Sequence, residues 1–260
     1  MSNDPHVRLD GVEMVYSQGE TALRALSGID VSVRRGELLS IIGPSGCGKS
    51  TLLRIVGGLL APTSGRVAID GQPPRQAQRR KEIGFAFQDA SLLPWRTVLG
   101  NIRLPLEVNR KRAGVDPGAL VDLVGLSTFR GYYPHQLSGG MQQRVALARS
   151  LVTSPSLLLM DEPFGALDEM TRSAMRYELL RIWRSAAENR PCTVLFVTHS
   201  ITEAVLLSDR VLVMTPRPGR VAALLDIDLP RPRREEIETD PVFLDYARRL
   251  RALLREPTLV

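Results

Sequence analysis

Cysteine is scarce in this sequence, and long apolar runs are missing. Only two cysteines, Cys47 and Cys192, occur among the 260 residues, which excludes a disulfide framework and a zinc site built from cysteine alone. The longest apolar stretches, such as 156–160 and 193–197, fall far short of the roughly 20 residues that a membrane-spanning helix needs. The first residues lack the apolar core of a secretory signal. We therefore expect the chain to start and stay in a reducing cytoplasm.

Internal repeats and low-complexity blocks are also lacking, and the composition is that of a globular protein, with 43% hydrophobic and 24% charged residues. The net charge of +6 favours anionic partners such as nucleic acid, a lipid surface or a nucleotide. The positive charge is scattered apart from one denser run, Arg231, Arg233 and Arg234. We interpret this run as a solvated tail, because charged runs are usually exposed.

Strand-like and helix-like segments alternate along most of the chain. Strands are predicted at 7–12, 29–33, 37–42, 66–69, 83–87, 157–160, 193–197, 210–214 and 221–227. Helices are predicted at 49–56, 98–108, 117–124, 141–152, 169–187, 201–207 and 241–254. The pattern predicts one α/β domain over 1–260. Its core lobe covers about 1–88 and 153–228, a helical lobe of about 89–152 is inserted into it, and a tail runs from about 229 to 260.

The strongest motif is a glycine-rich turn between the strand at 37–42 and the helix at 49–56. It fits G-x-x-x-x-G-K-[ST] and consists of Gly43, Pro44, Ser45, Gly46, Cys47, Gly48, Lys49, Ser50 and Thr51. The glycines allow backbone N–H groups to point inward as a nest for phosphates, and the helix start adds its positive dipole end. Lys49 is suited to the β- and γ-phosphates and Ser50 to Mg²⁺. The motif therefore predicts a P-loop that binds ATP and Mg²⁺.

Two acidic residues follow the apolar strand at 157–160. Such a strand carries a carboxylate from the core to the phosphate end of the sheet. Asp161 is suited to hold Mg²⁺ through a water molecule, and Glu162 is suited to polarise the water that attacks the phosphate. Standing alone, the segment would read as a buried strand with acidic surface residues at its end.

A second turn that can bind an anion lies far from the first. Ser138 stands in N-cap position before Gly139 and Gly140, and Met141 and Gln142 continue the helix. One P-loop already covers the phosphates, so a second nest needs another nucleotide to face. Two copies of the chain arranged head to tail would satisfy both, whereas the alternative for this segment alone is an ordinary capped helix.

With these motifs the chain resembles the ATP-binding subunits of ATP-binding-cassette (ABC) transporters over nearly its whole length. LSGGMQQR is similar to the family signature and precedes LLLMDEP, as in that family. The resemblance implies a P-loop NTPase core sheet with an N-terminal antiparallel β part and an inserted α-helical subdomain. It assigns Gln88 to Mg²⁺ and the γ-phosphate, His199 to the γ-phosphate, and Tyr16 to the adenine ring. The loop Gly165 to Asp168 would link the two active sites of a dimer.

Four further segments resemble the subunits of nitrate, sulfonate and taurine importers, namely FQDASLLPWRTVLGNI, YPHQLSGGMQQRVALARS, FGALDEMTR and TPRPGR. The resemblance implies an ATPase motor for small anions or related compounds, peripheral on the inner face of the cell membrane. Its partners would be a second copy, two transmembrane permease subunits and, indirectly, a periplasmic or lipid-anchored binding protein, with no nucleic acid. Trp95 would anchor the permease contact, unless it belongs to the core of the helical lobe.

One further expectation concerns Cys47, and two alternative functions stay open. Cys47 is expected to react with alkylating agents, because the loop amides and Lys49 should favour its thiolate. A soluble ABC ATPase acting on DNA or ribosomes is the first alternative, but this chain has a single uninterrupted cassette. A small P-loop kinase is the second alternative, and it leaves the turn from Ser138 to Gln142 unexplained.

Overall fold

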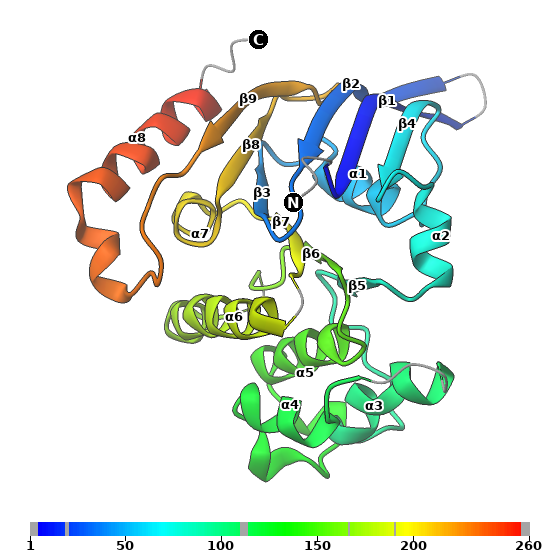
Figure 1. The fold of residues 1–260 in the computed structure, drawn as a ribbon, viewed down its shortest axis with the longest axis vertical. Helices are drawn as coiled ribbons and strands as arrows, with labels where there is room; N and C mark the ends of the chain where they lie inside the picture. Colours follow the sequence, from blue (N-terminus) through cyan, green and yellow to red (C-terminus); the bar gives the residue numbers. More distant parts are fainter. Residues whose placement is uncertain (1–4, 19–20, 110–113, 166, 190, 256–260) are drawn as a thin grey trace. The chain divides into compact units, whose positions relative to one another are not determined.

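The computed structural model describes residues 5–18, 21–109, 114–165, 167–189 and 191–255. The chain divides into two compact units. The first consists of Met1–Arg80 together with Thr193–Val260, and the second of Lys81–Cys192. Figure 1 gives the course of the chain through both.

The first unit contains a three-stranded antiparallel sheet in the order β2-β1-β4. Its strands are β1 (Val7–Gln18), β2 (Thr21–Val33) and β4 (Ser64–Ile69). Both β1 and β2 are longer than the sequence predicted, since they pair along their full length with register shifts between Leu9 and Val15. Such irregularities break the period-two alternation from which strands are recognised.

The same unit holds three parallel strands, with β3 (Leu38–Ile42) between β7 (Thr193–Val197) and β8 (Arg210–Met214). A fourth strand, β9 (Val221–Asp226), runs antiparallel beside β8. All residues of β3 and β7 are buried, as expected for parallel strands covered on both faces. This burial explains why their continuous apolar runs were predicted correctly.

The helices of the first unit are α1 (Lys49–Val56), α2 (Pro74–Arg79), α7 (Ile201–Leu207) and α8 (Pro241–Arg255), with a 3₁₀ turn at Glu235–Thr239. Sequence reasoning missed α2, whose segment PRQAQR buries only Ala77 and so carries no apolar periodicity. In Figure 1 α7 and α8 lie on the same side of β8 and β9, and they pack against each other.

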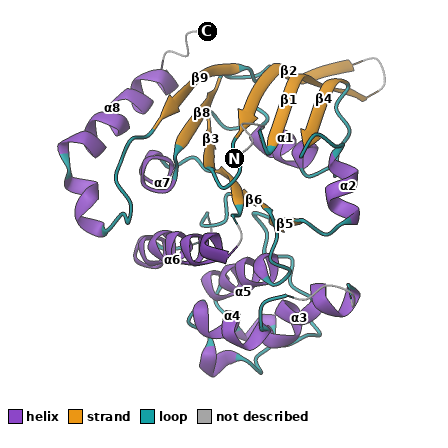
Figure 2. Ribbon diagram, in the orientation of Figure 1, coloured by secondary structure: helices purple, strands orange, loops and turns teal. Residues whose placement is uncertain are grey.

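The second unit is mainly helical, as Figure 2 shows. Its parallel strands are β5 (Ile83–Ala86) and β6 (Leu157–Asp161). All residues of β6 are buried. The helices are α3 (Val98–Val108), α4 (Pro117–Leu123), α5 (Gly139–Leu151) and α6 (Glu169–Asn189), with 3₁₀ turns at Ser127–Phe129 and Pro134–Gln136. No described helix of either unit has the length and apolarity needed to cross a membrane.

The tail contains a buried arginine, which contradicts the expectation of a solvated charge run. Arg233 is only 5% exposed. Its guanidinium donates hydrogen bonds to five carbonyl oxygens, those of Val205, Leu206, Ser208, Ile227 and Leu229, over 2.8–3.4 Å. The last carbonyls of a helix have no partner within the helix, so Arg233 satisfies the end of α7. Burial lowers the pKa of Arg233 to about 10.

Replacing this arginine tests its structural role. We expect Arg233→Met to lower the free energy of unfolding by about 2–4 kcal/mol, because buried carbonyls lose a charged donor. Arg251→Met is the matched control, since Arg251 is an exposed residue of α8, and a change within about 0.5 kcal/mol is expected. Urea unfolding followed by circular dichroism measures both. Equal stability of the two variants would contradict the role of Arg233.

Candidate functional site

The glycine-rich turn predicted from the sequence connects β3 to α1. Gly46 has a φ of 73° and Gly48 a φ of 105°, both in the left-handed region that favours glycine. A Cβ atom on Gly48 would lie 2.6 Å from Cδ2 of Leu26, so Leu26 would have to shift to admit a larger residue. The backbone thus adopts the tight conformation that a phosphate nest requires.

Helix α1 begins directly at this turn. Among the described residues no side chain caps its N-terminus, and its first turn contains no acidic residue. The N–H groups of a first helical turn, which have no partner within the helix, and the helix dipole both favour negative charge at such a place. Ser50 is the second residue of the helix and is half-buried.

Lys49 turns back into the loop. Its Nζ donates to the carbonyl oxygens of Gly43 at 2.8 Å and Pro44 at 3.1 Å, and the residue is 7% exposed. The ammonium group is therefore held within the loop whose amides would receive the phosphates. An ammonium, backbone amides and a helix N-terminus form a donor set that fits a triphosphate.

Tyr16, predicted to stack on adenine, lies beside the far end of the same loop. Its hydroxyl oxygen is 3.2 Å from Oγ1 of Thr51, and the residue is 38% exposed. The structure therefore brings Tyr16 and the loop together, with enough of the tyrosine accessible for a flat apolar group to pack against it.

His199 lies between β7 and α7 and is exposed to solvent. Three hydrogen bonds join the residues on either side of it, Thr198, Ser200 and Glu203. Oγ1 of Thr198 accepts from the N–H of Ser200 at 3.0 Å and donates to the carboxylate of Glu203, whose own N–H donates to Oγ of Ser200 at 3.3 Å. Thr198 and Glu203 are 2% and 4% exposed, so buried hydrogen bonds hold the backbone on either side of His199.

Sequence reasoning did not identify Thr198 and Glu203. The available signal was the spacing of Ser200 and Glu203, which fits the capping-box pattern S-x-x-E. In the structure the carboxylate of Glu203 accepts a hydrogen bond from the hydroxyl of Thr198, which is the residue directly before His199.

In the second unit, Asp161 ends β6 and Glu162 follows it. Asp161 is 4% exposed, whereas Glu162 is half-buried and has a φ of 46°. A non-glycine residue in this conformation costs of order 1–3 kcal/mol and is found preferentially at functional sites. The N–H of Gly165 donates to the carbonyl oxygen of Glu162 at 3.0 Å, which closes a tight turn directly after the acidic pair.

Gln88 follows β5 and is exposed. Its carbonyl oxygen accepts a hydrogen bond from Nε2 of Gln143, a residue of α5. The backbone at Gln88 is thereby tied to the helix that begins at the second predicted anion turn.

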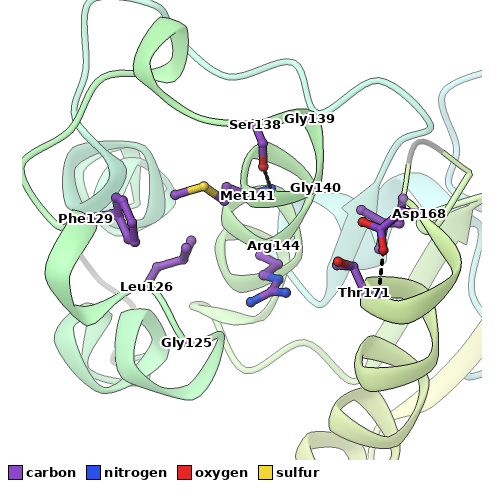
Figure 3. Close-up of a pocket in the computed structure, with 11 residues that line it drawn as sticks. Gly125, Leu126, Phe129, Ser138, Gly139, Gly140, Met141, Arg144, Asp168 and Thr171 are labelled. Carbon is purple, nitrogen blue, oxygen red and sulfur yellow. Dashed lines mark hydrogen bonds between the residues drawn. The ribbon is translucent and has the colours of Figure 1, made fainter.

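A cavity of about 500 Å³ lies at this second turn (Figure 3). Ser138 caps α5, since its Oγ accepts from the N–H of Met141 at 3.3 Å. Asp168 faces the same cavity and accepts at 2.9 Å from the N–H of Thr171, which holds the pKa of this carboxyl below its usual value. The lining consists of Gly125, Leu126, Phe129, Ser138, Gly139, Gly140, Met141, Arg144, Leu167, Asp168 and Thr171. The structure thus brings together the predicted signature turn and the predicted dimer loop, of which Ala166 lies outside the described residues.

Gln142 and Arg144, both residues of α5, lie differently with respect to this cavity. Gln142 does not line the cavity. Its Nε2 donates to the carbonyl oxygens of Pro134 and Leu137 at 3.0 and 3.3 Å, so its side chain holds the turn before the helix. Arg144 does line the cavity, and its buried Nε meets no acceptor among the described residues. The helical spacing from Gly140 to Arg144 could have placed this arginine on the cavity face.

The expected thiolate character of Cys47 is wrong. The residue is 1% exposed, and burial raises its pKa. Lys49, with its Nζ 4.0 Å from Sγ, and the loop amides act in the opposite direction without overcoming the loss of solvation. Sequence reasoning accounted for the neighbouring positive charge but not for the burial of the sulfur atom.

Alkylation of the nucleotide-free protein tests this environment. At pH 7 we expect N-ethylmaleimide to modify Cys47 at least about tenfold more slowly than an exposed thiol, because only the thiolate reacts. The rate should increase as the pH rises toward the raised pKa. Cys192 is the comparison, since burial raises its pKa to about 12. Peptide mass spectrometry over time measures both, and labelling of Cys47 at the rate of an exposed thiol would contradict the expectation.

Comparisons with known proteins agree with this geometry. The ABC transporter family matches residues 26–165. An aliphatic sulfonates import ATP-binding protein of Bacillus cereus is 42% identical, covering 90% of each chain. A nitrate import ATP-binding protein of Synechocystis is 39% identical, covering 96% of this chain and 95% of that protein. The dimeric ATP-binding cassette MJ0796, solved in a post-hydrolysis state with ADP and phosphate, is similar with a TM-score of 0.74 and 35% identity, covering 86% of this chain and 100% of that one.

These matches confirm the predicted α/β fold of a P-loop ATPase cassette. They extend over nearly the whole chain and include both the glycine-rich loop and the segment that opens at Ser138. The chain belongs to the ABC transporter family of ATP-binding proteins.

Proposed function

We propose that this chain is the ATP-hydrolysing motor of an importer for small anions or related compounds, such as nitrate, sulfonates or taurine. The observation that carries the proposal is the presence of two distinct turns in one chain, each with the backbone shape suited to bind an anion. One is the loop around Lys49 in the first unit, and the other is the cavity at Ser138 in the second. The import functions of the sulfonate and nitrate relatives support the class of substrate.

In the proposed site the loop from Gly43 to Thr51 holds the triphosphate, and Lys49 moves from the loop carbonyls to the β- and γ-phosphates. Ser50, Gln88 and Asp161 would hold Mg²⁺, since hydroxyl, amide and carboxylate oxygens are its preferred ligands. When bound, the ion offsets charge on the phosphates.

Hydrolysis is assigned to two further side chains. Glu162 accepts the proton of the attacking water as that water approaches the γ-phosphate, and His199 donates a hydrogen bond that stabilises the charge developing there. The bonds of Thr198 and Glu203 fix the histidine backbone, so little reorganisation is needed at that step.

The second anion turn completes the site of another copy. Ser138, Gly139 and Gly140 present a helix N-terminus to the γ-phosphate bound by the partner, and the guanidinium of Arg144 adds positive charge to the same cavity. Asp168 faces this cavity as well. ATP therefore joins two copies head to tail, and hydrolysis, which divides the triphosphate, separates them. The dimeric assembly of the similar cassette supports this arrangement.

The segment around Trp95 is proposed to contact the membrane subunits. Trp95 is 70% exposed, which argues against a place in the core of the helical lobe. The fully buried Asn101 holds the turn that presents it, through bonds to the backbone of Leu93, Arg96 and Thr97 at 2.8–3.2 Å. An exposed tryptophan on a turn held in this way is a typical interface anchor. We place the protein on the inner face of the membrane with two permease subunits and, through them, a binding protein.

Purification from detergent-solubilised membranes tests the proposal. The tagged protein should recover two permease subunits, and the associated binding protein should bind a small anion in a ligand screen by calorimetry. Recovery of nucleic acid with salt-dependent affinity, or of no membrane protein at all, would contradict the importer function.

Replacing Glu162 tests the chemical step. We expect Glu162→Gln to bind ATP with unchanged affinity and to hydrolyse it at least about 100-fold more slowly, because the general base is lost. The matched control is Glu178→Gln, which removes a carboxylate of α6 that pairs with Arg181 on the surface and should keep wild-type turnover. Phosphate release and equilibrium binding measure the two quantities. Wild-type turnover of Glu162→Gln would remove this residue from its role.

A further inference from the structure

The turn from Thr215 to Arg220, between β8 and β9, lies directly against the phosphate loop. A Cβ atom on Gly219 would be 2.1 Å from the carbonyl oxygen of Cys47, so the two backbones are in contact. The N–H of Gly219 donates to Ala25 at 2.9 Å and its carbonyl accepts from Ser27 at 3.0 Å. The turn is thus fixed on one side to β2 and on the other to the loop.

The turn is also fixed internally. Oγ1 of Thr215 accepts from the N–H of Arg220 at 3.0 Å and lies 3.0 and 3.2 Å from the carbonyl oxygens of Pro216 and Pro218. Two prolines restrict the backbone further. The side chain between them is therefore presented from a rigid support.

That side chain is Arg217, which reaches the phosphate loop at Gly46. Its Nε donates to the carbonyl oxygen of Gly46 at 3.3 Å, and one terminal nitrogen lies 3.0 Å from the position that a Cβ on Gly46 would take. The residue is exposed. The loop therefore has the guanidinium of Arg217 at Gly46 in addition to the ammonium of Lys49 at Gly43 and Pro44.

We propose that Arg217 is an ATP-binding residue that attracts the phosphate chain through its charge and selects for nucleotides with more phosphates. The inference rests on the proposed place of ATP in the loop at Lys49. The guanidinium of Arg217 is hydrogen-bonded to the loop whose amides would receive the phosphates. Attraction of this kind grows with the negative charge of the ligand.

Because Arg217 is exposed, salt screens its attraction. The screening length is about 8 Å at physiological ionic strength and about 3 Å at 1 M. A contribution of about three- to tenfold to ATP affinity at low salt is expected from an exposed charge near a triphosphate, and it should become small at 1 M salt. A purely structural role of the hydrogen bond to Gly46 would not show this dependence.

Calorimetric binding of ATP, ADP and AMP to four variants tests the proposal at low and high salt. We expect Arg217→Gln to weaken ATP binding about three- to tenfold at low salt, ADP binding less and AMP binding least. Arg217→Glu should weaken ATP binding further, and Arg217→Lys should restore most of the affinity because it keeps the charge. Arg220→Gln is the matched control, since Arg220 is an exposed cation of the same turn whose backbone N–H makes its bond to Thr215, and it should bind ATP as the wild type does.

Lys49→Ala separates this proposal from the proposed function. If Lys49→Ala loses ATP binding while Arg217→Gln binds all three nucleotides like the wild type, the role of Arg217 is wrong and the P-loop site stands. If Lys49→Ala binds ATP normally, the proposed site itself is wrong. Equal weakening by Gln and Lys at position 217, unchanged by salt, would overturn the electrostatic role.

Discussion

The register of β3 between β7 and β8 is the constraint on which the chemistry of the first unit depends. Ile41 pairs with Val197, and Ile42 pairs with Val213. The three strands are parallel and end together. The glycine-rich loop, His199 and the turn at Thr215 therefore all follow the carboxyl ends of neighbouring strands. A slip of one residue would exchange the two faces of β3, and it would separate the loop from both of its neighbours.

The turn that contains Arg217 and the tail that contains Arg233 support the loops at these strand ends and the helix α7. The turn that contains Arg217 packs on the phosphate loop, while Arg233 holds the last carbonyls of α7. Since His199 stands just before α7, the two ends of that helix are fixed by different means. The set formed by Thr198, Ser200 and Glu203 fixes the start, and the tail fixes the end. The tail is thus part of the fold of the first unit.

In the second unit a few side-chain hydrogen bonds hold helix α5 and the segments next to it. Ser138 caps it, Gln142 holds the preceding turn, and Gln143 binds the backbone of Gln88. The helix therefore connects two features of the proposed mechanism, the glutamine after β5 and the cavity at the signature turn.

The sequence by itself determined the features that depend on local chemistry. Glycines at 46 and 48, a serine before two glycines and apolar strands ahead of Gly43 and Asp161 each predict a backbone shape from neighbouring residues. Tertiary structure alone decided that Arg233 is buried, that Cys47 is shielded from water, and that Arg217 reaches Gly46. For Arg233 and Arg217, acceptor carbonyls come from segments distant in the chain, namely the region of α7 and the phosphate loop. Desolvation and hydrogen bonding across such distances leave no periodic signal in a sequence.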